Sequence, residues 1–147
     1  MTDAYESLRL RNQLCFPLYL CSKEIVRLYG PMLEQLNLTY TQYIVMMYFW
    51  ERRRSNAKEL SKALLLDPST LTPILKKLEQ KDYLSRMRDP GDERNLVITL
   101  TEEGAQLQSA ALDIPSRMGC CLGLTDEEAA ALGTLIGKVL NNIEKEL

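Results

Sequence analysis

The sequence predicts a mainly helical α+β fold, in which two short strands interrupt a series of amphipathic helices. Apolar side chains recur at the spacing of one helix face along most of the 147 residues. Residues 83–100 instead show two short strand-like runs on either side of the turn DPGDER. With 46% hydrophobic and 26% charged residues, the chain has a globular composition. We therefore expect one domain over residues 1–147, with the order α-α-α-α-β-β-α-α.

The distribution of charge points to an anionic partner. The formal net charge is −2, but residues 51–94 carry eleven Lys or Arg against eight Asp or Glu, a balance of +3. The remainder of the chain has a balance of −5, so basic charge is concentrated in one segment. A basic segment of this kind favours a nucleic-acid partner.

Cysteine and histidine usage narrows the chemistry. The chain has four cysteines and no histidine, which disfavours the usual zinc and haem sites and His-dependent nucleophilic catalysis. We expect no metal and no cofactor. No apolar run approaches the roughly 20 residues of a membrane span, and the N-terminus lacks the features of a signal peptide. A cytoplasmic protein without a membrane partner is predicted, in which disulfides are not structural.

Two helices are predicted in the first third of the chain. The first spans residues 6–29, where Leu14 and Leu18 share an apolar face, and Gly30-Pro31 ends or bends it. The second spans residues 40–52, with Thr39 as its N-cap.

A short helix pair follows. Residues 52–56 form a basic turn, and a helix runs from residue 57 to about residue 65. Asp67 is expected to cap the next helix, residues 68–80, which has one apolar face and tolerates Pro73 close to its first turn.

The strands and the last helices complete the order. Strands are expected at residues 83–88 and 96–100, joined by the charged turn 89–94. A helix over residues 101–119 with a kink at Pro115 follows, and the pattern Thr125-x-x-Glu128 marks the start of the last helix.

Residues 40–100 therefore match the outline of a winged helix-turn-helix, a DNA-binding module with a recognition helix and a basic hairpin. A helix face bearing Thr and Lys can also be ordinary solvated surface. The short preceding helix, the turn before the second helix and the basic hairpin together favour DNA. The candidate DNA-binding residues are Ser69, Thr70, Thr72, Lys76, Lys77, Arg86, Arg88 and Arg94.

The stretch LDPSTLTPILKKLEQKDYLSRMRDPGDERNLVITLTEEG resembles the winged core of MarR-type transcriptional repressors. The resemblance implies a homodimer on a palindromic operator in double-stranded DNA, with Arg94 in the minor groove and Asp92 holding it. Asp82-Tyr83 departs from the family pattern of Gly followed by an apolar residue. Independently of the resemblance, the helices at about 6–30 and 101–147 carry more apolar surface than one winged domain covers, which predicts dimerisation.

The first helix contains a candidate sensor. Taken alone, a cysteine such as Cys15 on an apolar helix face is more often an inert buried thiol. Tyr19 lies one turn away, but Tyr29 lies fourteen residues along, about 21 Å on the helix axis. Only an antiparallel partner helix could bring Tyr29 and Tyr40 back to Cys15. Tyrosine hydroxyls would there stabilise the thiolate, the form that reacts with peroxide.

The stretch NQLCF with these tyrosines resembles the organic-hydroperoxide-sensing branch of the MarR family. That implies oxidation of Cys15 to a sulfenic acid and then a disulfide, with release of the operator. Tyr29 and Tyr40 of the partner subunit would hold Cys15, and Tyr19 would line the site. The resolving thiol is either a small external thiol or Cys120 or Cys121, which can equally be packing residues.

Other functions remain open from the sequence. A MarR-type repressor could answer a phenolic or other apolar effector without covalent chemistry. A thiol peroxidase could use Cys15 as an enzyme, although the winged core is surplus to that activity. A dimeric adaptor could use the hairpin for protein contacts. We expect a regulator and not an enzyme.

Overall fold

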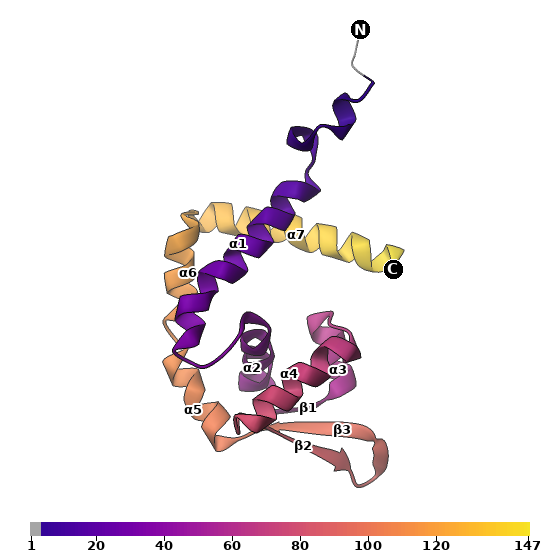
Figure 1. Ribbon diagram of the computed structural model, residues 1–147, viewed down its shortest axis with the longest axis vertical. Coiled ribbons are helices and arrows are strands. Elements are labelled where there is room, and N and C mark those ends of the chain that lie inside the picture. Colours follow the sequence, from indigo (N-terminus) through magenta and orange to yellow (C-terminus); the bar gives the residue numbers. More distant parts are fainter. Residues whose placement is uncertain (1–3) are drawn as a thin grey trace. The chain divides into compact units, whose positions relative to one another are not determined.

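The computed structural model describes residues 4–147, which form two compact units, one ending at Leu112 and the other spanning Asp113–Leu147 (Figure 1). The mainly helical α+β fold is as predicted. The elements of the first unit are the 3-10 helices η1 (Glu6–Leu8) and η2 (Leu10–Asn12), then α1 (Cys15–Glu34), α2 (Tyr40–Arg52), β1 (Arg54–Asn56), α3 (Ala57–Leu64), α4 (Pro68–Gln80), β2 (Leu84–Asp89), β3 (Asp92–Leu100) and α5 (Glu102–Ala110). The second unit holds α6 (Ile114–Leu122) and α7 (Asp126–Glu146).

Helix α1 begins and ends later than predicted. The segment before it is closed into 3-10 turns by its own side chains, because the Asn12 amide donates to the Glu6 carbonyl at 2.7 Å. At the other end the helix runs through Gly30-Pro31 to Glu34. Its last turn buries Met32 and Leu33, and this packing outweighs the hydrogen bond that Pro31 removes.

The predicted cap of α2 is confirmed as a full capping box. The Thr39 hydroxyl accepts from the Gln42 N–H at 3.3 Å, and Oε1 of Gln42 accepts from the Thr39 N–H at 3.1 Å. Gln42 is only 3% exposed, so the box lies inside the fold. It fixes the point at which the chain enters α2.

A three-residue strand, β1, was missed in the predicted basic turn. It pairs antiparallel with β3, which gives the sheet order β1-β3-β2, with Ser55 opposite Ile98 and Ile98 opposite Arg86. Strand β3 also starts earlier than predicted, at Asp92. A strand of three residues has no alternation to read, which explains the omission.

Helices α3 and α4 form the predicted helix-turn-helix. Asn56 caps α3, its Oδ1 accepting from the Glu59 N–H at 2.8 Å. Asp67 occupies the cap position of α4, but among the described residues its side chain forms no cap hydrogen bond, so that part of the prediction was wrong. Leu65 adopts the left-handed conformation (φ 51°) at the turn. The buried face of α4 consists of Leu71, Ile74, Leu75 and Leu78.

The predicted helix over residues 101–119 is two helices. Residues 111–113 interrupt it, and Pro115 lies in the first turn of α6, where its missing N–H leaves no bond unmade. Pro115 therefore lies at the start of a helix instead of kinking a longer one. The capping box of α7, Thr125 with Glu128, is confirmed.

Apolar side chains on two helices lie outside the core. In α1 only Met32 and Leu33 are buried, and none of the residues of α7 is. Within residues 4–147, no helix is long and apolar enough to span a membrane. The exposed apolar residues of the two helices include Leu18, Val26 and Leu28 on α1 and Leu132, Leu135, Ile136, Val139, Leu140 and Ile143 on α7.

Candidate DNA-binding and thiol sites

The solvent-facing side of α4 carries all five predicted helix residues. Ser69, Thr70 and Thr72 lie in its first turns and are exposed, as are Lys76 and Lys77. The Thr72 hydroxyl donates to the Pro68 carbonyl at 2.8 Å, so its proton is used within the helix, and the exposed oxygen can still accept a hydrogen bond. The N-terminal turn thus offers hydroxyls and main-chain N–H groups, which suit phosphates and base edges.

A cleft of about 760 Å³ lies between α3, α4 and the hairpin; we call it the α4–wing cleft. Lys58 and Lys62 of α3 line it together with Arg94 of β3. These two lysines were not among the predicted DNA-binding residues. Their spacing of four residues on the exposed face of the first helix of the pair was the available signal.

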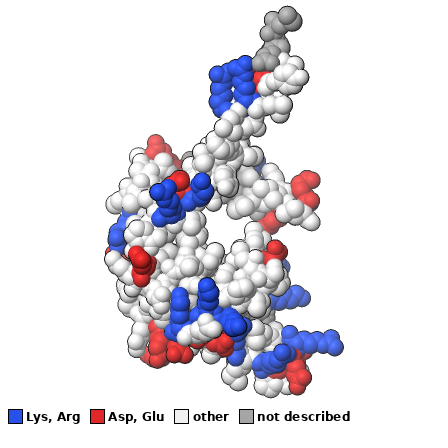
Figure 2. Space-filling model, in the orientation of Figure 1, with Lys and Arg blue, Asp and Glu red and all other residues white. Residues whose placement is uncertain are grey.

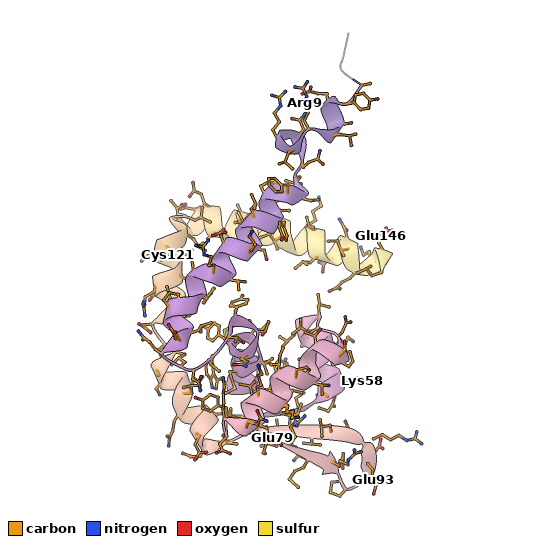
Figure 3. The ribbon with its side chains drawn as sticks, viewed as in Figure 1. Arg9, Lys58, Glu79, Glu93, Cys121 and Glu146 are labelled. Atoms are coloured by element: carbon orange, nitrogen blue, oxygen red, sulfur yellow. The ribbon has the colours of Figure 1, made fainter. Side chains whose placement is uncertain are left out.

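Basic side chains surround this cleft on the surface. Figure 2 shows Lys and Arg gathered over the hairpin and the adjoining helices, with acidic groups interspersed. In Figure 3, Lys58 lies on α3, and Glu93 lies at the turn of the hairpin. The arrangement can neutralise phosphates on either side of an inserted α4.

Arg86 lies at the base of the hairpin and is held by α4. Its Nε and Nη2 donate to the same carboxylate oxygen of Glu79, at 3.0 and 2.7 Å, and its side chain is 20% exposed. These hydrogen bonds hold the pKa of Glu79 below its usual range. Arg86 therefore joins the wing to α4, and contact with DNA would compete with this ion pair.

The tip of the hairpin leaves Arg94 exposed. Arg88 Nη1 donates to the Glu93 carbonyl at 2.8 Å, across the turn. Asp92 accepts from the main-chain N–H of Arg94 at 3.1 Å, so Asp92 orients the backbone of Arg94 instead of its guanidinium. In the described part of the chain the Arg94 guanidinium has no ion pair. That group is available to a groove or a phosphate.

Cys15 is the first residue of α1, and its side chain is exposed rather than buried. A helix N-terminus presents unpaired N–H groups that favour an anion. Tyr19, one turn along, is 63% exposed, and the Lys23 ammonium lies 5.9 Å from its ring centroid. The surroundings of Cys15 in one chain are thus open and incomplete.

Tyr29 and Tyr40 lie together, as part of a set of three tyrosines that we call the aromatic cluster. Their ring centroids are 4.8 Å apart, and Tyr43 completes the set at 5.7 Å from Tyr29. Tyr43, which packs edge-on against Trp50, was missed, although its spacing of three residues from Tyr40 puts it on the same helix face. Burial, and secondarily Tyr40, raises the pKa of Tyr29, and burial also raises the pKa of Tyr43. Their hydroxyls therefore stay protonated and can donate.

The other cysteines are free and exposed. Cys120 and Cys121 lie in α6, in the second unit, and Cys21 lies on α1. Among the described residues, no group of three or more His, Cys, Asp or Glu side chains could hold a metal ion.

Comparison with known proteins identifies the class. The family model described as Transcriptional regulator SarA/Rot matches residues 27–110. The organic hydroperoxide resistance transcriptional regulator of Bacillus subtilis is 42% identical over 92% of this chain and 90% of its own length.

Solved structures extend the match. Reduced AbfR bound to DNA has a TM-score of 0.77 and 36% identity, covering 94% of this chain and 98% of that one; AbfR from Staphylococcus epidermidis is also solved in overoxidized and disulfide-formed states. A MarR variant from E. coli complexed with operator DNA has a TM-score of 0.81 and 26% identity, covering 95% and 99%. The chain is therefore a DNA-binding transcriptional regulator that belongs to the MarR family, in the branch of the organic hydroperoxide resistance regulator.

Proposed function

We propose that the protein is a homodimeric repressor that releases a palindromic operator when an organic hydroperoxide oxidises Cys15. The observation that carries the proposal is the exposed Cys15 thiol at the start of α1, together with Tyr29 near the end of the same helix. Burial raises the pKa of Tyr29, so its hydroxyl can donate, and its ring contacts Tyr40 of α2. The name of the Bacillus subtilis relative and the redox states of AbfR support it.

DNA would be bound through α4 and the hairpin. Ser69 and Thr70 at the start of α4 would meet base edges and phosphates, with Lys76 and Lys77 further along the helix. The exposed Arg94 would enter the minor groove from the wing. Lys58 and Lys62 would add phosphate contacts from α3.

Dimerisation would cover the exposed apolar faces of α1 and α7. Burial of one Leu, Val or Ile side chain contributes about 1.5–3 kcal/mol, and α7 alone exposes six such residues. A twofold axis perpendicular to α1 would run the paired α1 helices in opposite directions. This would bring Tyr29 and Tyr40 of the partner subunit to the open side of Cys15, close to Tyr19.

The chemistry at Cys15 is a two-electron oxidation of sulfur. The thiolate attacks the protonated oxygen of the hydroperoxide; an S–O bond forms, the O–O bond breaks, and the departing alkoxide takes up a proton to become the alcohol. The product is a sulfenic acid. It condenses with a second thiol to a disulfide and releases water, the second thiol being either a small external thiol or Cys120 or Cys121.

Oxidation would weaken DNA binding by removing the anion that the tyrosine hydroxyls hold. An oxidised sulfur is neutral and bulkier, so it no longer matches hydrogen-bond donors arranged for a thiolate. The conformation that binds DNA would then lose stability relative to a conformation that does not. The spacing of the two α4 helices, about 34 Å for one turn of duplex, would then change.

A DNA-binding titration tests the proposal. The probe is a fluorescent duplex selected from a random library by the reduced wild-type protein, and the oxidant is cumene hydroperoxide. We expect oxidant to weaken binding by the wild type and to leave Cys15→Ser bound. Cys21→Ser is the matched control, because it removes another exposed thiol of α1. A Cys15→Ser protein that oxidant still releases would contradict the redox mechanism.

Disulfide formation after oxidation distinguishes the possible resolving thiols. A Cys120→Ser/Cys121→Ser variant that forms no disulfide without added small thiol identifies one of these cysteines as the partner of Cys15. Intact-mass measurement under non-reducing conditions reports the product directly.

A non-covalent effector is the second candidate. The α4–wing cleft combines apolar walls, from Leu71 and Leu75, with the basic groups of Arg86 and Lys62, which suits an apolar acid or phenol. A small phenol that releases both the wild type and Cys15→Ser from DNA would favour this function.

A further inference from the structure

Two side chains that follow α4 are bonded to the turn between α1 and α2. The ammonium group of Lys81 donates to the main-chain oxygen of Asn37 at 2.5 Å and to Oε1 of Gln42 at 2.9 Å. The hydroxyl of Tyr83 donates to the main-chain oxygen of Leu36 at 3.3 Å. The C-terminal end of α4 is therefore tied by three hydrogen bonds to a segment far from it in the sequence.

The acceptors lie in the segment that also holds the aromatic cluster. Gln42 is the buried capping residue of α2, bonded in both directions to Thr39. Tyr40 and Tyr43 flank Gln42 in the same turn of α2, and both contact Tyr29 of α1. A displacement of Tyr29 against Tyr40 thus shifts the turn in which Lys81 finds its acceptors.

The bonds of Lys81 are sensitive to such a shift. Lys81 is partly buried, and this burial, and secondarily the charge of Lys77, lowers the pKa of its ammonium group. A partly desolvated cation loses more than an exposed one when an acceptor moves away, because water does not fully replace the lost bond. Movement of α4 with its acceptors avoids this loss.

The position of the tie on α4 makes it effective. Lys81 is at the C-terminal end, whereas Ser69 and Thr70 are at the N-terminal end, about 18 Å away along a 13-residue helix. A small tilt about the tied end therefore displaces the DNA-facing end most. Arg86, paired with Glu79 in the last turn of α4, carries the hairpin along with the helix.

We infer that Lys81 and Tyr83 are positioning residues, which transmit a displacement of the aromatic cluster to α4 and so couple oxidation of Cys15 to DNA affinity. The inference rests on the proposed function, because it concerns how oxidation of Cys15 would change the position of α4. A merely structural tie would instead affect stability without affecting the ratio of the two affinities.

The test measures that ratio, the Kd of oxidised protein divided by the Kd of reduced protein, on the selected duplex. We expect a ratio of about 30 for the wild type and about 3 for Lys81→Met and for Tyr83→Phe, within the usual range of allosteric coupling. Lys81→Arg keeps the charge and should retain most of the wild-type ratio. Lys145→Met removes one lysine charge near the end of α7 and should not change it.

The outcomes separate the two claims. A wild-type ratio near one contradicts the proposed function itself. A normal wild-type ratio that Lys81→Met and Tyr83→Phe retain, with Cys15 oxidised to the same extent by intact mass, overturns the coupling role. If reduced Lys81→Met does not bind DNA, the ratio measured for Tyr83→Phe decides whether the coupling role holds, because this variant loses only one hydroxyl group.

Discussion

The winged module consists of α3, α4 and the β2–β3 hairpin. It differs from helix α1 in how much of its apolar surface is buried within one chain. In α4, Leu71, Leu75 and Leu78 are at most 2% exposed, and the Arg86–Glu79 pair ties the wing to the helix. In α1 only the last turn is buried, and Leu18 is 41% exposed. The winged module is closed by its own packing, whereas α1 leaves apolar side chains such as Leu18 on its surface. In the proposed dimer a second α1 would cover that face, and a change at Cys15 would act on the dimer without unfolding the winged module.

The largest expected effect concerns the exposed apolar face of α1. Leu18→Asp places a charge on the apolar face of α1, and an unpaired charge in a buried interface costs several kcal/mol, so we expect a dimer to dissociate at least 100-fold more readily. Light scattering after size exclusion measures the mass. Arg27→Asp, which puts an aspartate on the opposite, solvent-exposed side of α1, is the control and should stay dimeric. A dimeric Leu18→Asp protein would exclude this face from the interface.

The next effect concerns Gly104 of α5, which packs against the residues that follow α4. A Cβ atom on Gly104 would lie 2.2 Å from the Tyr83 carbonyl oxygen, and the Gly104 carbonyl accepts from Nε1 of Trp50 at 2.8 Å. We expect Gly104→Ala to lower the free energy of unfolding by about 3 kcal/mol, because backbone must move to admit the methyl group. Denaturant unfolding measures it. Gly30→Ala, where the new Cβ meets no atom within 4 Å outside the neighbouring helix backbone, should not destabilise the protein.

DNA affinity tests whether Arg94 and the two lysines of α3, Lys58 and Lys62, contact DNA together with α4. Arg94→Ala should weaken binding by about 1–3 kcal/mol if its guanidinium reads the minor groove. Lys62→Ala should weaken binding to all sequences alike and reduce the salt slope by about one. Anisotropy titrations at several salt concentrations measure both. Arg117→Ala on α6 is the charge-matched control; an equal loss there would show that only net charge matters.

The same contrast explains what the sequence could predict. The helix pair, the hairpin and the caps at Thr39 and Thr125 are local patterns, and the structure confirms them. Strand β1 was missed because its pairing with β3 is non-local. The start of α1 was misplaced because its apolar face continues into residues that their own side chains fold into 3-10 turns.

The candidate site divides in the same way. Spacing alone put Ser69, Thr70 and the lysines of α4 on its exposed face. It could not show that Arg86 bonds Glu79, or that Lys81 reaches the α1–α2 turn, because those partners are set by packing of elements apart in the sequence.

A smaller effect is expected at the turn after α4. Asp82 has φ 60°, the left-handed conformation in which a side chain is strained and glycine is not, and this is the position where the family pattern has Gly. Asp82→Gly should raise the free energy of unfolding by about 0.5–1 kcal/mol. Thermal melting measures the change. Destabilisation instead would show that the Asp82 side chain stabilises the turn.

The smallest effect is the pH dependence of the Arg86–Glu79 ion pair, which joins α4 to the wing. Hydrogen bonds from Arg86 lower the pKa of Glu79 from its usual 4.5, so the folded state favours the carboxylate. The stability that this adds is present above pH 4.5 and is lost as the pH falls through the folded-state pKa, because both states then bind the proton. Glu79→Gln should therefore melt slightly below the wild type at about pH 7, and the gap should close towards about pH 3. Glu144→Gln on α7 is the control, with no gap expected at either pH. A gap for Glu79→Gln that stays constant across this range would show that the side chain acts through shape and neutral hydrogen bonding instead of charge.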